Sequence, residues 1–225
     1  MMFTNRTEAG RRLAERLEKY ANRNDVLVLG IPRGGLPVAF AVAQALHAPL
    51  DVLLLRKLGV PAHEELAFGA IASGGVRVLD WDTLYELSIS PSQVEAVTAR
   101  ERCELERREL AYRGSRPALS ATGKTVILVD DGVATGASML AAIRALRQMQ
   151  PAQVVVAVPV APPIVCDRLS READEFVCVA APSHFVAVGQ FYDDFSQVSD
   201  EEVIDLLAEP AVSDGGVTPA RNQLR

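Results

Sequence analysis

Two adjacent carboxylates, Asp130 and Asp131, follow four β-forming residues at positions 126–129. A loop of small residues at 132–137 comes next, and a helical pattern begins at Ser138. In a tight turn between a strand and a helix, backbone N–H groups and the positive end of the helix dipole bind phosphate dianions. Carboxylates repel phosphate, but they accept hydrogen bonds from sugar hydroxyls. These residue types in this order therefore predict a site for a 5-phosphorylated ribose.

The segment 126–138 resembles the phosphoribosyl-diphosphate (PRPP) binding motif of the type I phosphoribosyltransferases. Both have four hydrophobic residues, two acids and a short Thr-Gly phosphate loop. An ordinary strand–turn–helix unit with an acidic end is the alternative, but the paired acids and the Ala-Thr-Gly loop would then coincide by chance. The resemblance implies PRPP-binding roles for eight residues: Asp130, Asp131, Val133, Ala134, Thr135, Gly136, Ala137 and Ser138.

A second segment, Ile-Pro-Arg-Gly-Gly-Leu-Pro at 31–37, resembles the diphosphate-binding loop of the same superfamily, especially that of bacterial xanthine phosphoribosyltransferases. Gly34 and Gly35 would let the backbone approach a diphosphate without a Cβ in the way, and Arg33 would add a charged donor. A glycine-rich turn with a solvated arginine explains this segment equally well on its own. With the ribose-phosphate motif downstream, diphosphate binding is the better interpretation.

Arg56 and Lys57 follow a predicted strand at 51–55. They resemble the basic pair that precedes the mobile catalytic loop in orotate and adenine phosphoribosyltransferases, which implies that Lys57 contacts the diphosphate. Two solvated basic residues are the alternative, and they explain Arg56 better than Lys57. The glycine-containing segment 58–75 is predicted to be a long loop that closes over the site as a lid and excludes water.

Residues 184–195 loosely resemble the hood of hypoxanthine-type enzymes, with a spacing that differs by one residue. The resemblance implies that Phe185 stacks on the base and that Asp193 helps Asp130 and Asp131 to bind Mg²⁺. A packed hood residue is the alternative for Phe185, and the better supported one.

Ala134 departs from the hypoxanthine-guanine enzymes, which have an acid at this position of the phosphate loop that contacts N7 of the purine. Alanine at this position matches the adenine enzymes instead. No lysine precedes the hood motif to contact a 6-oxo group. A 6-oxopurine is therefore not the expected acceptor.

Composition excludes several classes of protein. The 225 residues, 49% of them hydrophobic, suit one globular domain. A net charge of −6 gives no support to nucleic-acid binding. Three cysteines without a C-x-x-C pair argue against a disulfide framework or a zinc site. With no visible signal peptide and no apolar run of about 20 residues, we expect a cytoplasmic protein that binds no membrane.

Apolar runs and helical patterns alternate along the chain, which predicts an α/β fold with a mainly parallel, Rossmann-like sheet flanked by helices. In such sheets ligands bind beyond the carboxyl ends of the strands. The predicted strands are 26–30, 51–55, 76–79, 126–129, 153–158 and 175–179. The predicted helices are 6–22, 36–46, 91–112, 138–149, 163–172 and 199–207.

These elements predict a single domain over residues 1–209, with a core at about 24–180 and a small hood built from both termini. The helix at 91–112 is an insertion relative to the smallest members of the family. Its many Glu and Arg residues suit a solvated face, or a subunit contact in a homodimer. Residues 210–225 are predicted to be a disordered tail.

The resemblance implies transfer of the 5-phosphoribosyl group between PRPP and a nitrogenous base or related nitrogen nucleophile, with release of diphosphate. Arg33, Lys57 and Asp131 are the expected catalytic residues and Mg²⁺ the expected cofactor. A regulatory module that senses PRPP without catalysis is the alternative, although the chain has no helix-turn-helix extension. A hydrolase of another kind has no support from a Gly-x-Ser-x-Gly or Asp-x-Asp motif.

Overall fold

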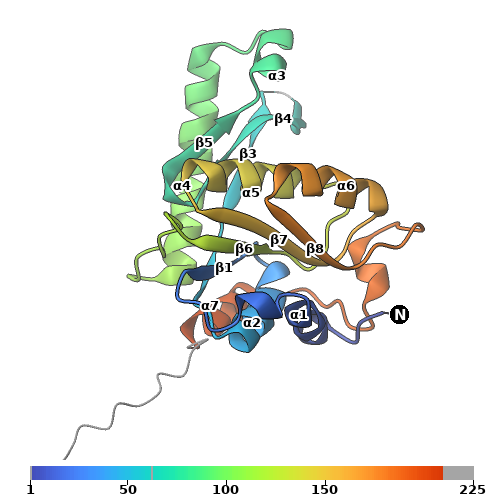
Figure 1. The fold of residues 1–225 in the computed structure, drawn as a ribbon. Coiled ribbons are helices and arrows are strands. Elements are labelled where there is room, and N and C mark those ends of the chain that lie inside the picture. The colour runs from blue at the N-terminus through green and yellow to red at the C-terminus, as the bar shows by residue number, and fades with distance from the viewer. Residues whose placement is uncertain (1, 62, 210–225) are drawn as a thin grey trace, which may run out of the picture.

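The computed structural model describes residues 2–61 and 63–209 (Figure 1). Within them, five parallel strands form a central sheet in the order β2-β1-β6-β7-β8. This confirms the predicted parallel α/β fold. The strands of this sheet are β1 (Val26–Gly30), β2 (Leu50–Val52), β6 (Thr125–Val129), β7 (Gln153–Val160) and β8 (Glu175–Ala180).

Helices cover both faces of the central sheet (Figure 1). On one face lie α1 (Arg6–Glu15) and α2 (Gly35–Leu46), and on the other lie α5 (Ala137–Gln148) and α6 (Pro163–Glu172). Every residue of β1 and β6 is buried. Successive side chains of a strand point to opposite faces, so a strand covered on both sides reads as a continuous apolar run. This explains why both strands could be recognised in the sequence.

The segment 58–75 is not the long loop that the sequence predicted. It belongs to a second, antiparallel sheet with the strand order β3-β4-β5. Its small residues gave it the composition of a loop, yet Leu58, Phe68 and Ile71 are buried in this sheet. The strands are β3 (Leu55–Val60), β4 (His63–Ala72) and β5 (Val76–Leu79), with the 3-10 turn η2 (Ser73–Gly75) before β5.

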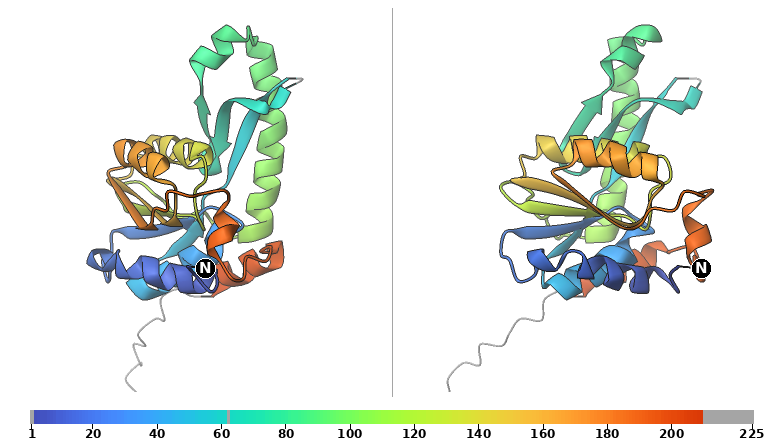
Figure 2. Two further views of the ribbon diagram at one scale, coloured as in Figure 1. Left: turned by 90° about the vertical axis from the view of Figure 1, so that its right-hand side faces the viewer. Right: turned by 45° about the vertical axis from the view of Figure 1, so that its right-hand side comes forward.

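We call residues 55–113 the arm, because they extend away from the central sheet (Figure 2). Besides the antiparallel sheet, the arm contains α3 (Trp81–Glu86), which the sequence did not predict, and the predicted long helix α4 (Pro91–Arg113). Ser90 and Gln93 form a capping box at the start of α4. Val94, Val97 and Leu105 on α4 are buried in one cluster with residues of β3 and α7 (Asp200–Ala208). One face of α4 is therefore packed, and the other is solvated.

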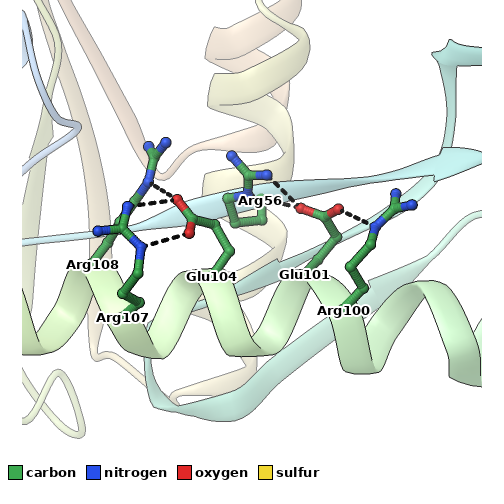
Figure 3. Close-up of polar contacts among 6 residues, drawn as sticks. All are labelled: Arg56, Arg100, Glu101, Glu104, Arg107 and Arg108. Atoms are coloured by element: carbon green, nitrogen blue, oxygen red, sulfur yellow. Dashed lines mark hydrogen bonds and ion pairs between the residues drawn. The ribbon is translucent and has the colours of Figure 1, made fainter.

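Ion pairs join α4 to β3 and link neighbouring turns of α4 (Figure 3). The Nε and Nη2 atoms of Arg56 donate to Oε2 of Glu101, at 2.9 and 2.6 Å, and Nε of Arg100 donates to Oε1 of the same carboxylate at 3.0 Å. One turn further, Arg107 and Arg108 both donate to Glu104, which lowers the pKa of that carboxyl to about 2. Arg56 is therefore a structural residue that holds α4 against the arm sheet.

Segments near both termini pack together as the hood, which we define as residues 2–5 and 181–198. The backbone N–H groups of Met2 and Phe3 donate to the carbonyl of Phe191 in the 3-10 helix η3 (Val188–Phe191). Another 3-10 helix, η1 (Glu18–Tyr20), follows α1, so the predicted helix 6–22 is interrupted. No helix of the described residues is long and apolar enough to cross a membrane. The predicted disordered tail, 210–225, lies outside the described residues.

A buried ion pair fixes the end of α4 to the central sheet. Nε of Arg113 donates to Oδ1 of Asp51 at 2.8 Å, and the two side chains are only 8% and 7% exposed. Nη2 of Arg113 also donates to the carbonyl of Val52 at 2.7 Å. Since β2 is an edge strand of the central sheet, this contact sets where the arm leaves the core.

We expect Arg113→Met to lower the free energy of unfolding by about 3–5 kcal/mol, because it leaves the Asp51 carboxylate buried without its cation. Urea denaturation measures this loss. Arg107→Met is the matched control, since it removes a solvent-exposed ion pair on the same helix and should leave the free energy of unfolding nearly unchanged. Equal losses in the two variants would contradict the assignment.

Candidate active site

Asp130 and Asp131 follow the last residue of β6 and lie at the carboxyl edge of the central sheet. Val129 is in register with Gly30, the last residue of β1, so the loops after both strands leave the sheet side by side. Because the acids follow the end of a strand, the sequence predicts that they face solvent. Both residues are only partly exposed in the structure, and the Asp131 side chain is 13% exposed. The site is therefore more enclosed than the sequence indicated.

Each carboxylate has one oxygen engaged and one open. Oδ1 of Asp130 accepts from the backbone N–H of Asp131 at 2.8 Å, and Oδ2 of Asp131 accepts from Nε of Arg6, also at 2.8 Å. The other two oxygens accept no hydrogen bond from the side chain or backbone of another described residue. No buried side-chain oxygen or nitrogen in the described part of the chain lacks a partner, so neither open oxygen is completely shielded from solvent. They provide two adjacent acceptors, as a sugar diol requires.

The electrostatics of the acid pair are unfavourable without further positive charge. Burial raises the pKa of Asp130 well above its usual range, and the neighbouring charge of Asp131 raises it further. Burial also raises the pKa of Asp131, although the Arg6 guanidinium opposes that shift. Mg²⁺ is commonly held by one or two carboxylates together with substrate phosphates, so the two open oxygens fit such an ion.

The glycines at the start of α2 lie directly against the acid pair. A Cβ on Gly34 would come within 2.1 Å of Oδ2 of Asp131, and one on Gly35 within 3.0 Å of Oδ1 of Asp130. From the sequence, we expected these glycines to let the backbone approach a ligand. The structure shows that they also let the backbone pack directly against the two acids. Arg33 is near Asp200 of α7, with a long contact of 3.8 Å between Nη1 and Oδ1.

The predicted phosphate loop turns at Gly136, whose φ of 78° lies in the left-handed region that favours glycine. No side chain caps the N-terminus of α5, so its first N–H groups face the loop without a protein side-chain acceptor. Ala134, Thr135 and Ser138 are exposed around this turn, as is Ala137. Arg168 of α6 donates to the carbonyl of Thr135, a contact that the sequence did not reveal.

Lys57 lies within β3 rather than at the end of a central strand. Its partner in β4 is Ala70, which in turn pairs with Val78 on the face of the arm sheet that packs against α5. Lys57, Ser138 and Arg144 line one cavity of about 730 Å³ between the arm and α5. Lys57 makes no ion pair with any described residue, so its charge is available beside the phosphate loop.

The two hood candidates, Phe185 and Asp193, differ in their surroundings. Phe185 packs on Phe191, with ring centroids 5.1 Å apart, as a partly buried member of the hood cluster. Asp193 is exposed, and the described residues contain no group of three or more His, Cys, Asp or Glu that could hold a metal, so its contribution to a metal site stays a prediction. Asp130 and Asp131 remain the candidate metal ligands.

Two hood-side residues that the sequence did not suggest contact Asp131. They are Arg6, through the carboxylate, and Tyr192, whose hydroxyl donates to the backbone carbonyl. Burial raises the pKa of the Tyr192 hydroxyl, so it stays protonated as a donor. Arg6 is 125 positions away from Asp131 in the sequence, and no local pattern connects them.

A model of the phosphoribosyl transferase domain matches residues 3–196, which include every segment of the site described above. The chain belongs to this family. Two Mycobacterium tuberculosis proteins, from strains CDC 1551 and H37Rv and each named "putative phosphoribosyl transferase", are 47% identical to it over 206 residues. The match covers 92% of this chain and 46% of each relative, so the chain spans about half their length.

Solved structures support the same family fold. The crystal structure of TT1426 from Thermus thermophilus has a TM-score of 0.82 and 45% identity, and the match covers 92% of this chain and 98% of TT1426. The AQ2163 protein of Aquifex aeolicus, at 16% identity and a TM-score of 0.50, shares the fold over 93% of this chain and 86% of its own. The likeness to TT1426 therefore extends over the arm as well as the core.

Asp130→Asn should stabilise the protein at neutral pH. Folding raises the pKa of Asp130, so the folded state holds the proton more tightly than the unfolded state does. Such an acid lowers the stability of the protein as the pH rises above the unfolded pKa of about 3.9. Asparagine removes the charge and can still accept from the Asp131 N–H. We expect the Tm at pH 7 to rise by about 2–4 °C for each kcal/mol gained, and the gain to shrink toward about pH 4.

Thermal scans across this pH range test the expectation. Asp193→Asn, at an exposed position in the hood, is the control and should leave the Tm unchanged. A lower Tm for Asp130→Asn at pH 7 would show that the Asp130 charge is instead a stabilising part of the fold.

Proposed function

We propose that this protein transfers the 5-phosphoribosyl group from PRPP to a nitrogenous base or a related nitrogen nucleophile and releases diphosphate. The observation that carries the proposal is the pair of open carboxylate oxygens on Asp130 and Asp131 beside the uncapped N-terminus of α5. A ribose diol and a 5-phosphate need these two kinds of group side by side. Family membership supports the same chemistry.

The residues divide into three subsites. Asp130 and Asp131 accept hydrogen bonds from the ribose hydroxyls, and the loop from Val133 to Ser138 binds the 5-phosphate through its N–H groups. The third subsite, at the end of the neighbouring strand β1, binds the diphosphate through Arg33, Gly34 and Gly35, with Lys57 approaching from the arm. The close approach of the two glycines to the acid pair supports this division.

Cleavage of the bond to diphosphate creates positive charge on the ribose and negative charge on the leaving group, as in glycoside cleavage. The protein then assists mainly by electrostatics. Arg33 and Lys57 stabilise the departing diphosphate, while Asp130 and Asp131 hold the sugar in place. When bound, Mg²⁺ would supply further positive charge at the diphosphate, and the open oxygens of Asp130 and Asp131 would hold it.

The acceptor is expected to be a base other than a 6-oxopurine. Ala134 is exposed in the phosphate loop and offers no group that could exchange a proton with a purine N7. A buried polar atom without a partner costs about 1–3 kcal/mol, so hypoxanthine and guanine should be poor acceptors. Phe185 packs on Phe191 in the hood, so we assign it a packing role rather than that of an isolated stacking platform for the base.

The rival function is a cytoplasmic PRPP-sensing module that binds the sugar phosphate without turnover. Lys57 distinguishes the two, because a lysine charge beside the phosphate loop is needed for catalysis but not for sensing. The three free cysteines agree with the reducing compartment that both functions share.

Calorimetry with Mg-PRPP, followed by assay of released diphosphate with a panel of purines, pyrimidines and pyridine carboxylates, tests the proposal. We expect binding below millimolar concentration, diphosphate release with at least one acceptor, and a loss of affinity on the order of tenfold in Asp130→Asn. Absence of Mg-PRPP binding by folded protein would rule out both functions. Binding without release for any acceptor would favour the sensor.

Lys57→Ala and Arg33→Ala should each lower kcat by about 10²–10³-fold, the usual effect of removing a group that stabilises transition-state charge. Neither should change the affinity for ribose 5-phosphate, which has no diphosphate. Steady-state kinetics and calorimetry measure the two effects. If either variant lost ribose 5-phosphate affinity as severely as Asp130→Asn, the separation into subsites would be wrong.

A further inference from the structure

Arg6 makes three contacts at the meeting point of the acid pair and the hood. Its Nε donates to Oδ2 of Asp131 at 2.8 Å, and its Nη1 donates to the carbonyl of Ser196 at 2.7 Å. Its guanidinium carbon lies 3.9 Å from the centroid of the Phe195 ring. The Arg6 and Asp131 side chains are only 11% and 13% exposed. Arg6 is therefore fixed in orientation by the hood and donates from that fixed position to a site carboxylate.

The hood residues around Arg6 form a continuous stack. The Tyr192 ring lies between those of Phe3 and Phe195, at 5.3 and 5.1 Å, and its hydroxyl donates to the backbone carbonyl of Asp131. Asp131 is thus held twice, through its backbone by Tyr192 of the hood and through its side chain by Arg6 of α1. A Cβ placed on Gly34 would lie 3.4 Å from Nε of Arg6, so the same guanidinium also borders the diphosphate loop.

We propose that Arg6 is a positioning residue for ribose recognition: by holding Oδ2 of Asp131, it directs the open Oδ1 toward the sugar hydroxyls. This inference rests on the proposed function of the site. Arg6 engages one carboxylate oxygen only, and Oδ1 of Asp131 accepts no hydrogen bond from another described residue. A carboxylate free to rotate would present its oxygens in many orientations, whereas one fixed by a charged donor presents a single acceptor in one direction.

Arg12 provides a matched control on the same helix. It also contacts the hood, donating to the carbonyl of Met2 at 2.7 Å and lying 4.9 Å from the Phe3 ring centroid, but it makes no contact with the acid pair. Arg12→Gln and Arg6→Gln therefore remove the same kind of hood contact, and only the second removes the constraint on Asp131. Arg6→Lys keeps a positive charge near Asp131 but loses the planar group that stacks on Phe195.

The experiment compares the affinities of ribose 5-phosphate, 2-deoxyribose 5-phosphate and inorganic phosphate by calorimetry. Unmodified protein should prefer ribose 5-phosphate over its deoxy analogue on the order of tenfold, since the analogue lacks one hydroxyl. In Arg6→Gln this preference should fall to about twofold or less, with unchanged affinity for inorganic phosphate, which contacts only the loop. Arg6→Lys should show an intermediate preference, and Arg12→Gln should retain the full one.

Three results would overturn the proposal. The first is an unchanged ribose preference in Arg6→Gln, and the second is an equal loss of inorganic phosphate affinity, which would indicate general damage to the site. The third is an equal loss of the ribose preference in Arg12→Gln. If Arg6→Gln does not fold, Arg6→Lys decides, because a full ribose preference without the stacked guanidinium contradicts the inference. Failure of the unmodified protein to bind ribose 5-phosphate would instead refute the proposed function itself.

Discussion

The rest of the site depends on one constraint: two adjacent residues of like charge are partly buried. Asp130 and Asp131 follow a fully buried strand, and burial raises the pKa of both carboxyls. A backbone N–H engages one oxygen of Asp130, and Arg6 engages one oxygen of Asp131. Position 34 must be glycine, because a Cβ there would overlap the Asp131 carboxylate. In the proposed function, this local cost in stability is the consequence of placing two acceptors where a sugar diol and a cation would bind.

The central sheet brings the proposed subsites together because two adjacent inner strands are in register. Gly30 of β1 pairs with Val129 of β6, so the glycine loop and the acid pair leave the sheet at the same level. Both strands are covered on both faces by helices, which excludes water below the site while the carboxyl edge stays accessible. The positive end of α5 then lies beyond the acids, where an anionic group is favoured.

In the arm, side chains on the two faces of β3 have different roles. Arg56 and Lys57 are consecutive residues of β3, so their side chains point to opposite faces of the arm sheet. Both residues line the cavity beside α5, but Arg56 pairs with Glu101 and holds α4, whereas Lys57 makes no ion pair with any described residue. A pair of basic residues that looks uniform in the sequence thus divides into a structural cation and a candidate catalytic one.

The sequence alone determined the parallel α/β core, the places of the acid pair, the glycine loop and the loop before α5, and the bounds of α4 to within a residue. Each of these depends on local signals: continuous apolar runs, adjacent acids, turn glycines and a capping serine. The tertiary structure alone decided that 58–75 is a hairpin and not a loop, and that Arg6 and Tyr192 contact Asp131. These features depend on the packing of segments far apart in the chain, and residues joined only by folding leave no periodicity or spacing in a single sequence.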